Sequence, residues 1–440
     1  MNQSRAIIVV ENREALRVAA ASARISTQQG TALEILEKSL GDEKDLRLID
    51  KVLSSGHKSV IEHQTFSIAF NDVSVLAEQF LIEARLASFT VKSRRYVDFG
   101  AAGYVVPDGL TAAQRARYAA AMEARFDDYQ RLMALGVPKE DARFVLPYCL
   151  RSNFFMTLDA RELIALICAM LDGRGRGFGE IEALGAQLRE QFDALYPGVI
   201  DRERPRYAGC AMAALPTEIA EPDVARGGAE LLSAPADAEG LLGAALGFSG
   251  RIGAGEGGLS RDVVRALITD ARPRELELLN YGFRIRNISL ACLTHFARHR
   301  IQSPVIPPVI RALAGGRFVL PETVAADPAA EALYRHAFEA QAAAAREALS
   351  MGMRPEDASY FALSGHQLDI LISMNARELL HFMKLRACSR AQWEIRGVAM
   401  EMLRLLRAES PAVFEGYGAS CRLGPCPEGR MSCGKPWERF

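Results

Sequence analysis

Two copies of one sequence pattern run through this chain, and this duplication restricts its fold more than any other feature. Three polar positions recur at an offset of 215 residues: Ser74 with Ser289, Arg85 with Arg300, and Ser88 with Ser303. Residues 158–163 recur as 374–379 at an offset of 216, and residues 180–181 recur as 394–395 at 214. Anchors that keep nearly one offset indicate duplication of a whole domain, because solenoid repeats recur every ~20–50 residues.

The boundary between the copies is expected where both patterns lapse. Residues 206–228 are rich in Ala, Pro and Gly and are typical of a linker. We therefore predict a first copy over 1–205, a linker over 206–228, and a second copy over 229–440 that ends in a cysteine-containing tail (416–440).

Within the first copy, the residue pattern predicts more helix than strand. Alternation and apolar runs predict strands at 7–10 and 66–70, and helical spacing predicts helices at 13–24, 74–82, 110–135, 160–171 and 180–195. Strands and helices do not alternate regularly, so a parallel sheet is not indicated. The predicted fold class is α+β, built from two tandem copies.

Composition excludes several classes of protein. The 440 residues include 53 Lys plus Arg and 54 Asp plus Glu, so bulk positive charge for nucleic acid or a membrane surface is lacking. No apolar run approaches the roughly 18 residues that span a bilayer, and the first residues do not resemble a signal peptide. Eight cysteines are too sparse for a disulfide scaffold. A cytoplasmic protein without a nucleic-acid or membrane partner is expected.

The second copy contains a compact cluster of donors at residues 298–303. Arg298, His299 and Arg300 follow an apolar, helix-like stretch, and Ser303 comes three residues later. Guanidinium groups suit phosphate or carboxylate ligands. A solvated helix end, with its cations placed favourably against the helix dipole, explains the cluster equally well.

The first copy has lost that cluster and has a different one. Glu83 and Ala84 stand at the positions of Arg298 and His299, and Ser93-Arg94-Arg95-Tyr96 follows. This second cluster suits a phosphate, or is an exposed basic turn. The second copy has Pro308–Arg311 at those positions. Since the copies retain different halves of one polar set, we favour a composite site.

Two further segments carry polar side chains. His57 and His63 are six residues apart, which does not suit a pair of metal ligands on one helix face. In the second copy, Arg377 and His381 are four apart and share a helix face, with Asn375 before them and Arg386 after them.

Together these segments resemble the flavin-dependent thymidylate synthases. That family has Arg-His-Arg with a Ser three residues later, a Ser-x-Arg-Tyr, an upstream His-x-Ser-x-x-Glu-His, and a downstream Asn-x-Arg…Arg…Gln-Trp-Glu. This chain has all of them, divided between its copies: 57–63 and 93–96 in the first, 298–303 and 375–394 in the second. The resemblance covers most of both copies and implies a helix-rich fold with a mixed or antiparallel sheet in each.

The resemblance also implies ligands and roles. It implies FAD as cofactor, dUMP as substrate, and NADPH and methylenetetrahydrofolate as co-substrates, in homotetramers with shared sites. Arg386 matches the arginine that polarises the uracil. The positions implied to bind substrate are Ser93, Arg95, Arg143, Arg298 and His295, the last standing where the family usually has Gln. The positions implied to bind cofactor are His63, Ser88, Arg298, His299, Arg300, Ser303, Asn375, Arg377 and His381.

Each copy departs from the family pattern where the other keeps it. The first lacks the Arg-His-Arg and the uracil arginine (Met170), and the second lacks the histidine segment, the Ser-x-Arg-Tyr and a counterpart of Arg143 (Ser359). One chain is therefore expected to imitate a dimer, and a homodimer to imitate the family tetramer. Two alternatives are a divergent flavin enzyme acting on another pyrimidine nucleotide or substrate, and a noncatalytic flavin- or nucleotide-binding protein.

The sequence contains two other motifs. Gly253-Ala254-Gly255-Glu256-Gly257-Gly258 satisfies G-x-G-x-x-G, but Ser249–Ile252 before it do not form a buried strand, so a flexible loop is expected. In the tail, Cys421, Cys426 and Cys433 are close enough in sequence to bind zinc or an iron–sulfur cluster, or to remain free or redox-active thiols.

Overall fold

The computed structural model describes residues 4–12, 14–209, 214–253 and 259–440. The chain folds as two compact units. Unit 1 contains residues 1–219 and 327–363, and unit 2 contains 220–326 and 364–440. A segment of the second copy thus belongs to unit 1. The copy boundaries predicted above refer to the sequence and stay a prediction.

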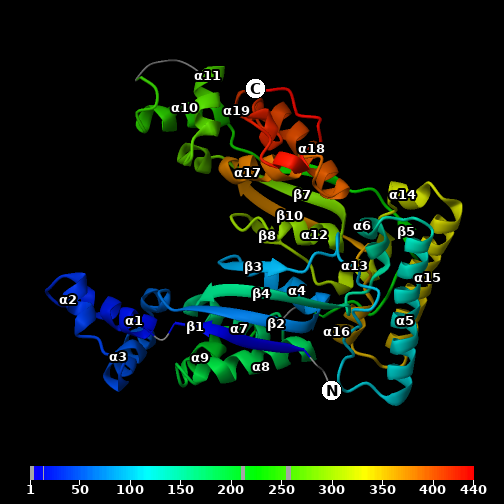
Figure 1. The fold of residues 1–440 in the computed structure, drawn as a ribbon, viewed down its shortest axis with the longest axis horizontal. Helices are drawn as coiled ribbons and strands as arrows, with labels where there is room; N and C mark the ends of the chain where they lie inside the picture. Colours follow the sequence, from blue (N-terminus) through cyan, green and yellow to red (C-terminus); the bar gives the residue numbers. More distant parts are fainter. Residues whose placement is uncertain (1–3, 13, 210–213, 254–258) are drawn as a thin grey trace. The chain divides into compact units, whose positions relative to one another are not determined.

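The two units contain sheets of the same topology (Figure 1). In unit 1 the order is β1 (Arg5–Glu11), β2 (Thr65–Ser74), β4 (Arg151–Asp159) and β3 (Ala87–Val91), all antiparallel. In unit 2 it is β6 (Gly228–Ser233), β7 (Asn280–Ser289), β10 (Gln367–Asn375) and β8 (Ser303–Val305), also antiparallel. This repeated sheet confirms the α+β prediction with tandem copies.

The helices predicted in the first copy are present within a few residues of their expected ends. In unit 1 the helices are α1 (Glu14–Ile25), α2 (Ala32–Glu37), α3 (Glu43–Ser54), α4 (Val75–Ile82), α5 (Ala112–Ala134), α6 (Lys139–Ala142), α7 (Ala160–Leu171), α8 (Gly179–Asp193), α9 (Val199–Glu203), α15 (Pro328–Ser350) and α16 (Pro355–Ala358). In unit 2 they are α10 (Ala238–Phe248), α11 (Arg261–Thr269), α12 (Leu290–Phe296), α13 (Ile310–Ala314), α14 (Glu322–Ala325), α17 (Ala376–Arg386), α18 (Trp393–Glu409) and α19 (Pro411–Phe414). Unit 2 also has a short parallel pair, β5 (Asp223–Val224) with β9 (Arg317–Phe318).

Each sheet has a β-bulge at an equivalent position of the two sequence copies. Asp72 and Asn287 adopt positive φ values of 53° and 50°. Their backbone N–H groups donate to side chains on the neighbouring strand, Asn153 Oδ1 at 2.9 Å and Asp369 Oδ1 at 3.0 Å. Short polar residues tolerate the left-handed region, so this bulge is built into both copies.

The turn from strand to helix is also shared. Ser74 caps α4 and Ser289 caps α12, each through its hydroxyl. A buried carboxylate braces each serine, since Glu180 accepts from the Ser74 N–H at 2.8 Å and Glu394 from the Ser289 N–H at 2.7 Å. A capping serine typically stabilises a helix by about 1 kcal/mol, and the glutamates satisfy a further buried donor.

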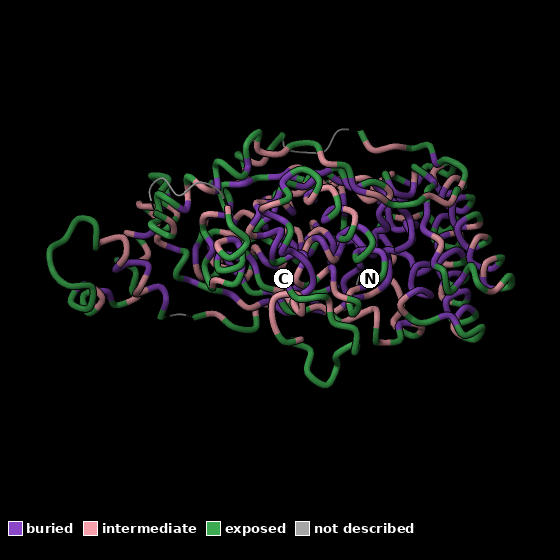
Figure 2. Tube along the Cα trace, turned by 90° about the horizontal axis from the view of Figure 1, so that it is seen from above, coloured by how far each residue is buried: buried purple, intermediate pink, exposed green. Residues whose placement is uncertain are grey.

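Unit 1 includes the long helix of each copy. α5 and α15 contact each other, and each has buried residues at intervals along its length. Figure 2 shows the burial of residues along the whole trace. Arg125 on α5 donates to the Ala337 carbonyl of α15 and pairs with Asp128 at 2.7 Å. Tyr118 and Tyr334 are fully buried. Pairing these helices gives each a partner for its apolar face.

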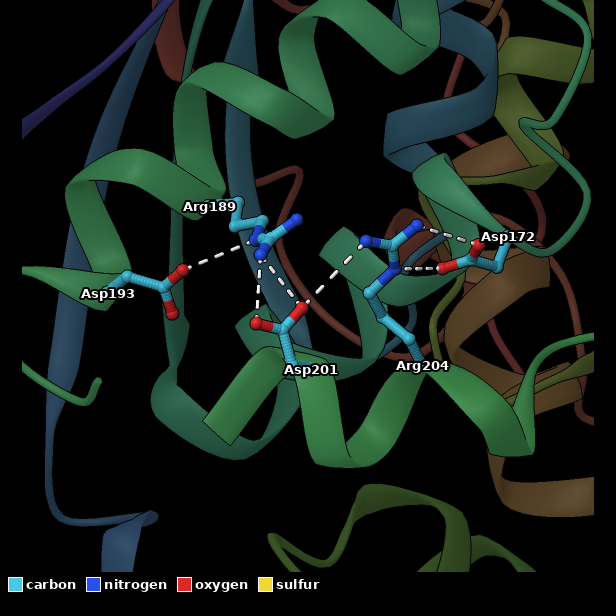
Figure 3. Close-up of polar contacts among 5 residues, drawn as sticks. All are labelled: Asp172, Arg189, Asp193, Asp201 and Arg204. Atoms are coloured by element: carbon cyan, nitrogen blue, oxygen red, sulfur yellow. Dashed lines mark hydrogen bonds and ion pairs between the residues drawn. The ribbon is translucent and has the colours of Figure 1, made fainter. Parts of the chain in front are cut away.

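Ion pairs connect α9, the last helix of the first copy, and the adjacent Arg204 to α8 and to the end of α7 (Figure 3). Arg189 on α8 pairs with Asp193 at 3.3 Å and with Asp201 on α9 at 2.8 Å. Arg204 binds Asp172, just after α7, at 2.6 Å, and lies 3.9 Å from Asp201. Such partly exposed pairs contribute little singly and more as a network.

Within the described ranges, no helix has both the length and the hydropathy required to span a membrane.

Candidate functional site

A chain of three polar side chains forms the centre of the candidate site in unit 2. His299 lies between α12 and β8 and is 2% exposed. Its Nδ1 lies 3.1 Å from Glu378 Oε1, and its Nε2 accepts a hydrogen bond from Arg386 Nε at 3.0 Å. An arginine only donates, so Nε2 carries the lone pair and the ring proton sits on Nδ1, donated to Glu378. We refer to Glu378, His299 and Arg386 as the central triad.

The surroundings keep the His299 ring neutral. Burial lowers the pKa of His299; the hydrogen bond to Glu378 opposes this effect, and the Arg386 charge adds to it. The ring packs against Phe382, with centroids 4.8 Å apart, and lies 5.5 Å from the ring of His381. The neutral imidazole therefore accepts from Arg386 and holds the guanidinium in one orientation.

Sequence reasoning missed Glu378. It is the third residue of α17, where its N–H donates to the capping Asn375 Oδ1 at 2.9 Å, and it is 7% exposed. An acid in the first turn of a helix has an ordinary explanation in the helix dipole. The available signal was an acid at this helix position that the first copy repeats as Glu162.

The residues around His299 separate by exposure. Arg298, Arg300 and Ser303 are exposed, while the neighbouring Gln302 is buried and donates to the Phe296 carbonyl. His295 is half-buried in α12, and its carbonyl lies 3.5 Å from Arg386 Nη2. Four of the predicted residues, Arg298, Arg300, Ser303 and His295, thus lie near the central triad in unit 2.

A pocket of about 560 Å³ opens beside α17. It contains three of the predicted cofactor residues, Asn375, Arg377 and His381, together with Glu378 of the central triad. The full lining is Asp270, Ala271, Pro273, Glu277, Ile301, Asn375, Arg377, Glu378, Leu380, His381 and Lys384. Its volume and its mixture of donors and acceptors suit a nucleotide-sized ligand.

Arg377 has a partner that both copies retain. It pairs with Glu277, and the equivalent Arg161 pairs with Glu62 at 2.6 Å. Since the first copy keeps this pair although it lacks a counterpart of His299, the pair orders α7 and α17 in the fold. Arg377 therefore lines the pocket as part of an ion pair with Glu277.

The predicted phosphate ligands of the first copy come together in unit 1. Arg95 pairs with Glu140, its Nε lying 3.0 Å from Oε1 and its Nη2 3.1 Å from Oε2. The Arg143 Nε donates to the Glu140 carbonyl at 2.9 Å, and the Ser93 hydroxyl accepts from the Arg95 N–H at 3.3 Å. Two cations and a hydroxyl thus gather around one acidic residue.

Arg94, next to Arg95 in sequence, has a different role. It is nearly buried and pairs with the buried Glu78, with Nη1 2.8 Å from Oε2 and Nη2 3.0 Å from Oε1. Desolvation acts to lower the pKa of Arg94, but the Glu78 carboxylate outweighs it and the pKa is raised. Arg94 is therefore a structural residue of unit 1.

The other two predicted residues of the first copy lie at its sheet. His63 is exposed, just before β2. Ser88 is exposed on β3 opposite Thr157, as Ser303 on β8 lies opposite Ser373. The predicted residues thus fall into one group in each unit.

An ion pair occupies the first-copy positions that correspond to the Arg-His-Arg segment. Glu83, which stands in place of Arg298, pairs with Arg174 at 2.9 Å and accepts from Gln79 Nε2 at 3.1 Å. Burial and the nearby Asp159 raise the pKa of Glu162, which corresponds to Glu378, and Ala84 stands at the position of His299. The first copy thus retains the acid but not the triad.

The structure gives the metal prediction no support. Cys421, Cys426 and Cys433 form no disulfide, and no group of three or more His, Cys, Asp or Glu among the described residues could hold a metal ion. A hydrogen bond with Ser389 lowers the pKa of the exposed Cys433. Of the glycine-rich motif, residues 254–258 lie outside the described ranges.

Comparisons with known proteins agree with the duplicated fold. A protein family described as thymidylate synthase complementing protein matches residues 8–198 and 250–412. A flavin-dependent thymidylate synthase from Geobacter sulfurreducens is 40% identical over 166 residues, covering 37% of this chain and 72% of that relative. Another from Nitratidesulfovibrio vulgaris is 35% identical over 184 residues, covering 39% and 75%.

A solved structure gives a weaker match. A UMP/dUMP methylase from Streptomyces cacaoi bound with 5-Br dUMP aligns at a TM-score of 0.39 with 24% identity, covering 47% of this chain and 96% of that chain.

Proposed function

Because the chain belongs to the thymidylate synthase complementing protein family, we propose that it methylates dUMP at C5 in a flavin-dependent reaction. FAD is the proposed cofactor, and NADPH and methylenetetrahydrofolate are the proposed co-substrates. The observation that supports this proposal most is the central triad, since it fixes the orientation of Arg386 and includes Glu378, which lines the nucleotide-sized pocket.

Arg386 is the proposed catalytic residue. Reduction and methylation of a uracil ring place negative charge on its carbonyl oxygens, and a preoriented guanidinium stabilises that charge without reorganising. Glu378 and His299 act as positioning residues, because the hydrogen bond from Arg386 Nε to His299, which Glu378 orients, fixes the guanidinium. Removing one donor from such a site typically costs about 10²–10³ in kcat.

The pocket beside α17 offers polar groups that suit a flavin dinucleotide. Asn375, Arg377 and His381 would hold it, offering an amide, a guanidinium and an imidazole from one helix. The bound flavin would supply the hydride-transfer chemistry. Arg298, His299, Arg300, Ser303, His63 and Ser88 are the further proposed cofactor residues.

Ser93, Arg95 and Arg143 are proposed to bind the dUMP phosphate. Glu140 binds the Nε and Nη2 of Arg95 and so orients its guanidinium. A phosphate would compete with that carboxylate for the same edge of the guanidinium. Arg298 and His295 are the other proposed substrate residues. Each copy lacks what the other retains, so we propose that one active site needs residues from both copies, in a homodimer.

The test is activity with the purified chain. We expect a bound yellow chromophore and conversion of dUMP to dTMP that requires methylenetetrahydrofolate and NADPH, together with rescue of a thymidine-requiring strain. A protein with bound flavin but no dTMP formation would support the alternative of a divergent flavin enzyme, which His295 in place of the usual Gln favours. A protein without flavin would contradict both.

A further inference from the structure

Lys384 lies on the pocket face of α17 and is not explained by the proposed roles. Arg377, His381 and Lys384 follow one another at intervals of four and three residues, so they share one face of the helix. All three line the 560 Å³ pocket. Lys384 therefore places an ammonium group in the same cavity as the two proposed flavin ligands.

In the described ranges, the Lys384 side chain differs from the other charged residues of the pocket in having no direct partner. Two lining acids have their own cation, since Asp270 pairs with Arg251 at 2.6 Å and Glu277 pairs with Arg377. The third, Glu378, accepts a hydrogen bond from the neutral His299 ring at 3.1 Å. Within the part of the chain that the structure describes, the Lys384 ammonium forms no ion pair or hydrogen bond. The Lys384 ammonium thus has no direct partner among the described residues.

Lys384 is also partly removed from water. Its residue is half-buried, and burial lowers its pKa. A lysine on an ordinary surface extends its head group into solvent and keeps its full hydration. A half-buried ammonium without a carboxylate is unfavourable on its own, so an anionic ligand would stabilise this arrangement.

The first copy has no equivalent cation. Cys168 occupies the corresponding position, is fully buried, and has its pKa raised by burial to about 12. Ala165 stands where the second copy has His381. The unpartnered ammonium is therefore specific to the second copy and its pocket.

We propose that Lys384 binds the diphosphate of the flavin dinucleotide in this pocket. The proposal rests on the proposed function, because it takes the flavin dinucleotide as the occupant. It adds a phosphate ligand that neither the Arg-His-Arg segment nor Arg377 supplies, since the Arg377 charge is already matched by Glu277.

The test compares flavins with and without phosphate. Flavin-free protein is titrated with FAD and with riboflavin, and binding is followed by the change in flavin fluorescence, so activity is not needed. We expect Lys384→Met to weaken FAD binding about 10–100-fold, the range of a charge-assisted hydrogen bond, and to leave riboflavin binding within about twofold. Lys384→Arg should retain most of the FAD affinity, and Lys435→Met, an exposed lysine outside the pocket, should change neither.

Several outcomes would overturn the proposal. FAD affinity unchanged in Lys384→Met, or equal losses for FAD and riboflavin, would show that Lys384 does not contact phosphate. Should Lys384→Met fail to fold, as judged by its circular dichroism, Lys384→Gln serves in the same comparison. A wild-type protein that binds no flavin at all would instead contradict the proposed function, so the two failures are distinguishable.

Discussion

Glu378→Ala provides the sharpest test of the central triad. The substitution removes the acceptor of the buried His299 Nδ1–H, which lies 3.1 Å from the carboxylate. A hydrogen bond to a charged group contributes about 1.5–3 kcal/mol, and leaving a buried donor unsatisfied costs a similar amount. We therefore expect the free energy of unfolding to fall by about 2–3 kcal/mol.

The duplication supplies a matched control. Glu162 occupies the same third position of α7, below a capping Asp159, but Ala84 stands where the second copy has His299. Glu162→Ala should lose only the helix-dipole contribution, at most about 0.3–1 kcal/mol. Burial already disfavours its charged form, since its pKa is raised, and this makes the loss smaller still.

Urea unfolding followed by circular dichroism would measure both changes, with two transitions fitted if the units unfold separately. A double-mutant cycle of Glu378→Ala with His299→Ala should give a coupling energy of about 1–3 kcal/mol. Equal losses in Glu378→Ala and Glu162→Ala, or a coupling near zero, would refute the reasoning that Glu378 acts through His299.

The remaining predictions concern charge and pH. Arg386→Lys keeps the charge but loses the planar fork, so kcat for dTMP formation should fall about 10²-fold while the melting temperature stays nearly unchanged. The pKa of His299 is lower in the folded state, so its contribution to stability is complete above the unfolded value of ~6.5 and is lost as pH falls toward the folded value. The free energy of unfolding, measured from pH 7.5 to 5.5, should therefore decline more in the wild type than in His299→Gln. Parallel declines in the two proteins would contradict this reasoning. Arg94→Met leaves a buried carboxylate unpaired and should cost about 3–5 kcal/mol of stability, whereas Arg95→Met should mainly weaken dUMP binding in calorimetric titrations. Glu140→Gln frees the Arg95 guanidinium and should tighten dUMP binding; weaker binding would mean that the carboxylate positions Arg95 rather than competing with phosphate.

Neighbouring residues show where reading the sequence stops being sufficient. Arg94 and Arg95 belong to one predicted basic cluster, yet the structure buries the first against Glu78 and leaves the second on the more accessible Glu140. Both arginines have the same chemistry and nearly the same position in the chain. Only the partners that the fold brings to each side chain separate a structural residue from a candidate ligand.

The sequence by itself determined the duplication, the α+β class, the main helices of the first copy, and the shared face of Arg377 and His381, because periodicity and repeated spacing are local properties of the chain. Tertiary structure alone decided that Glu378 meets His299 across 79 residues, that Glu140 meets Arg95, and that α15 belongs with α5 in unit 1. Those pairings depend on burial and on contacts between distant segments. Their free energy is set by which groups lose water together, and no short stretch of sequence contains that information.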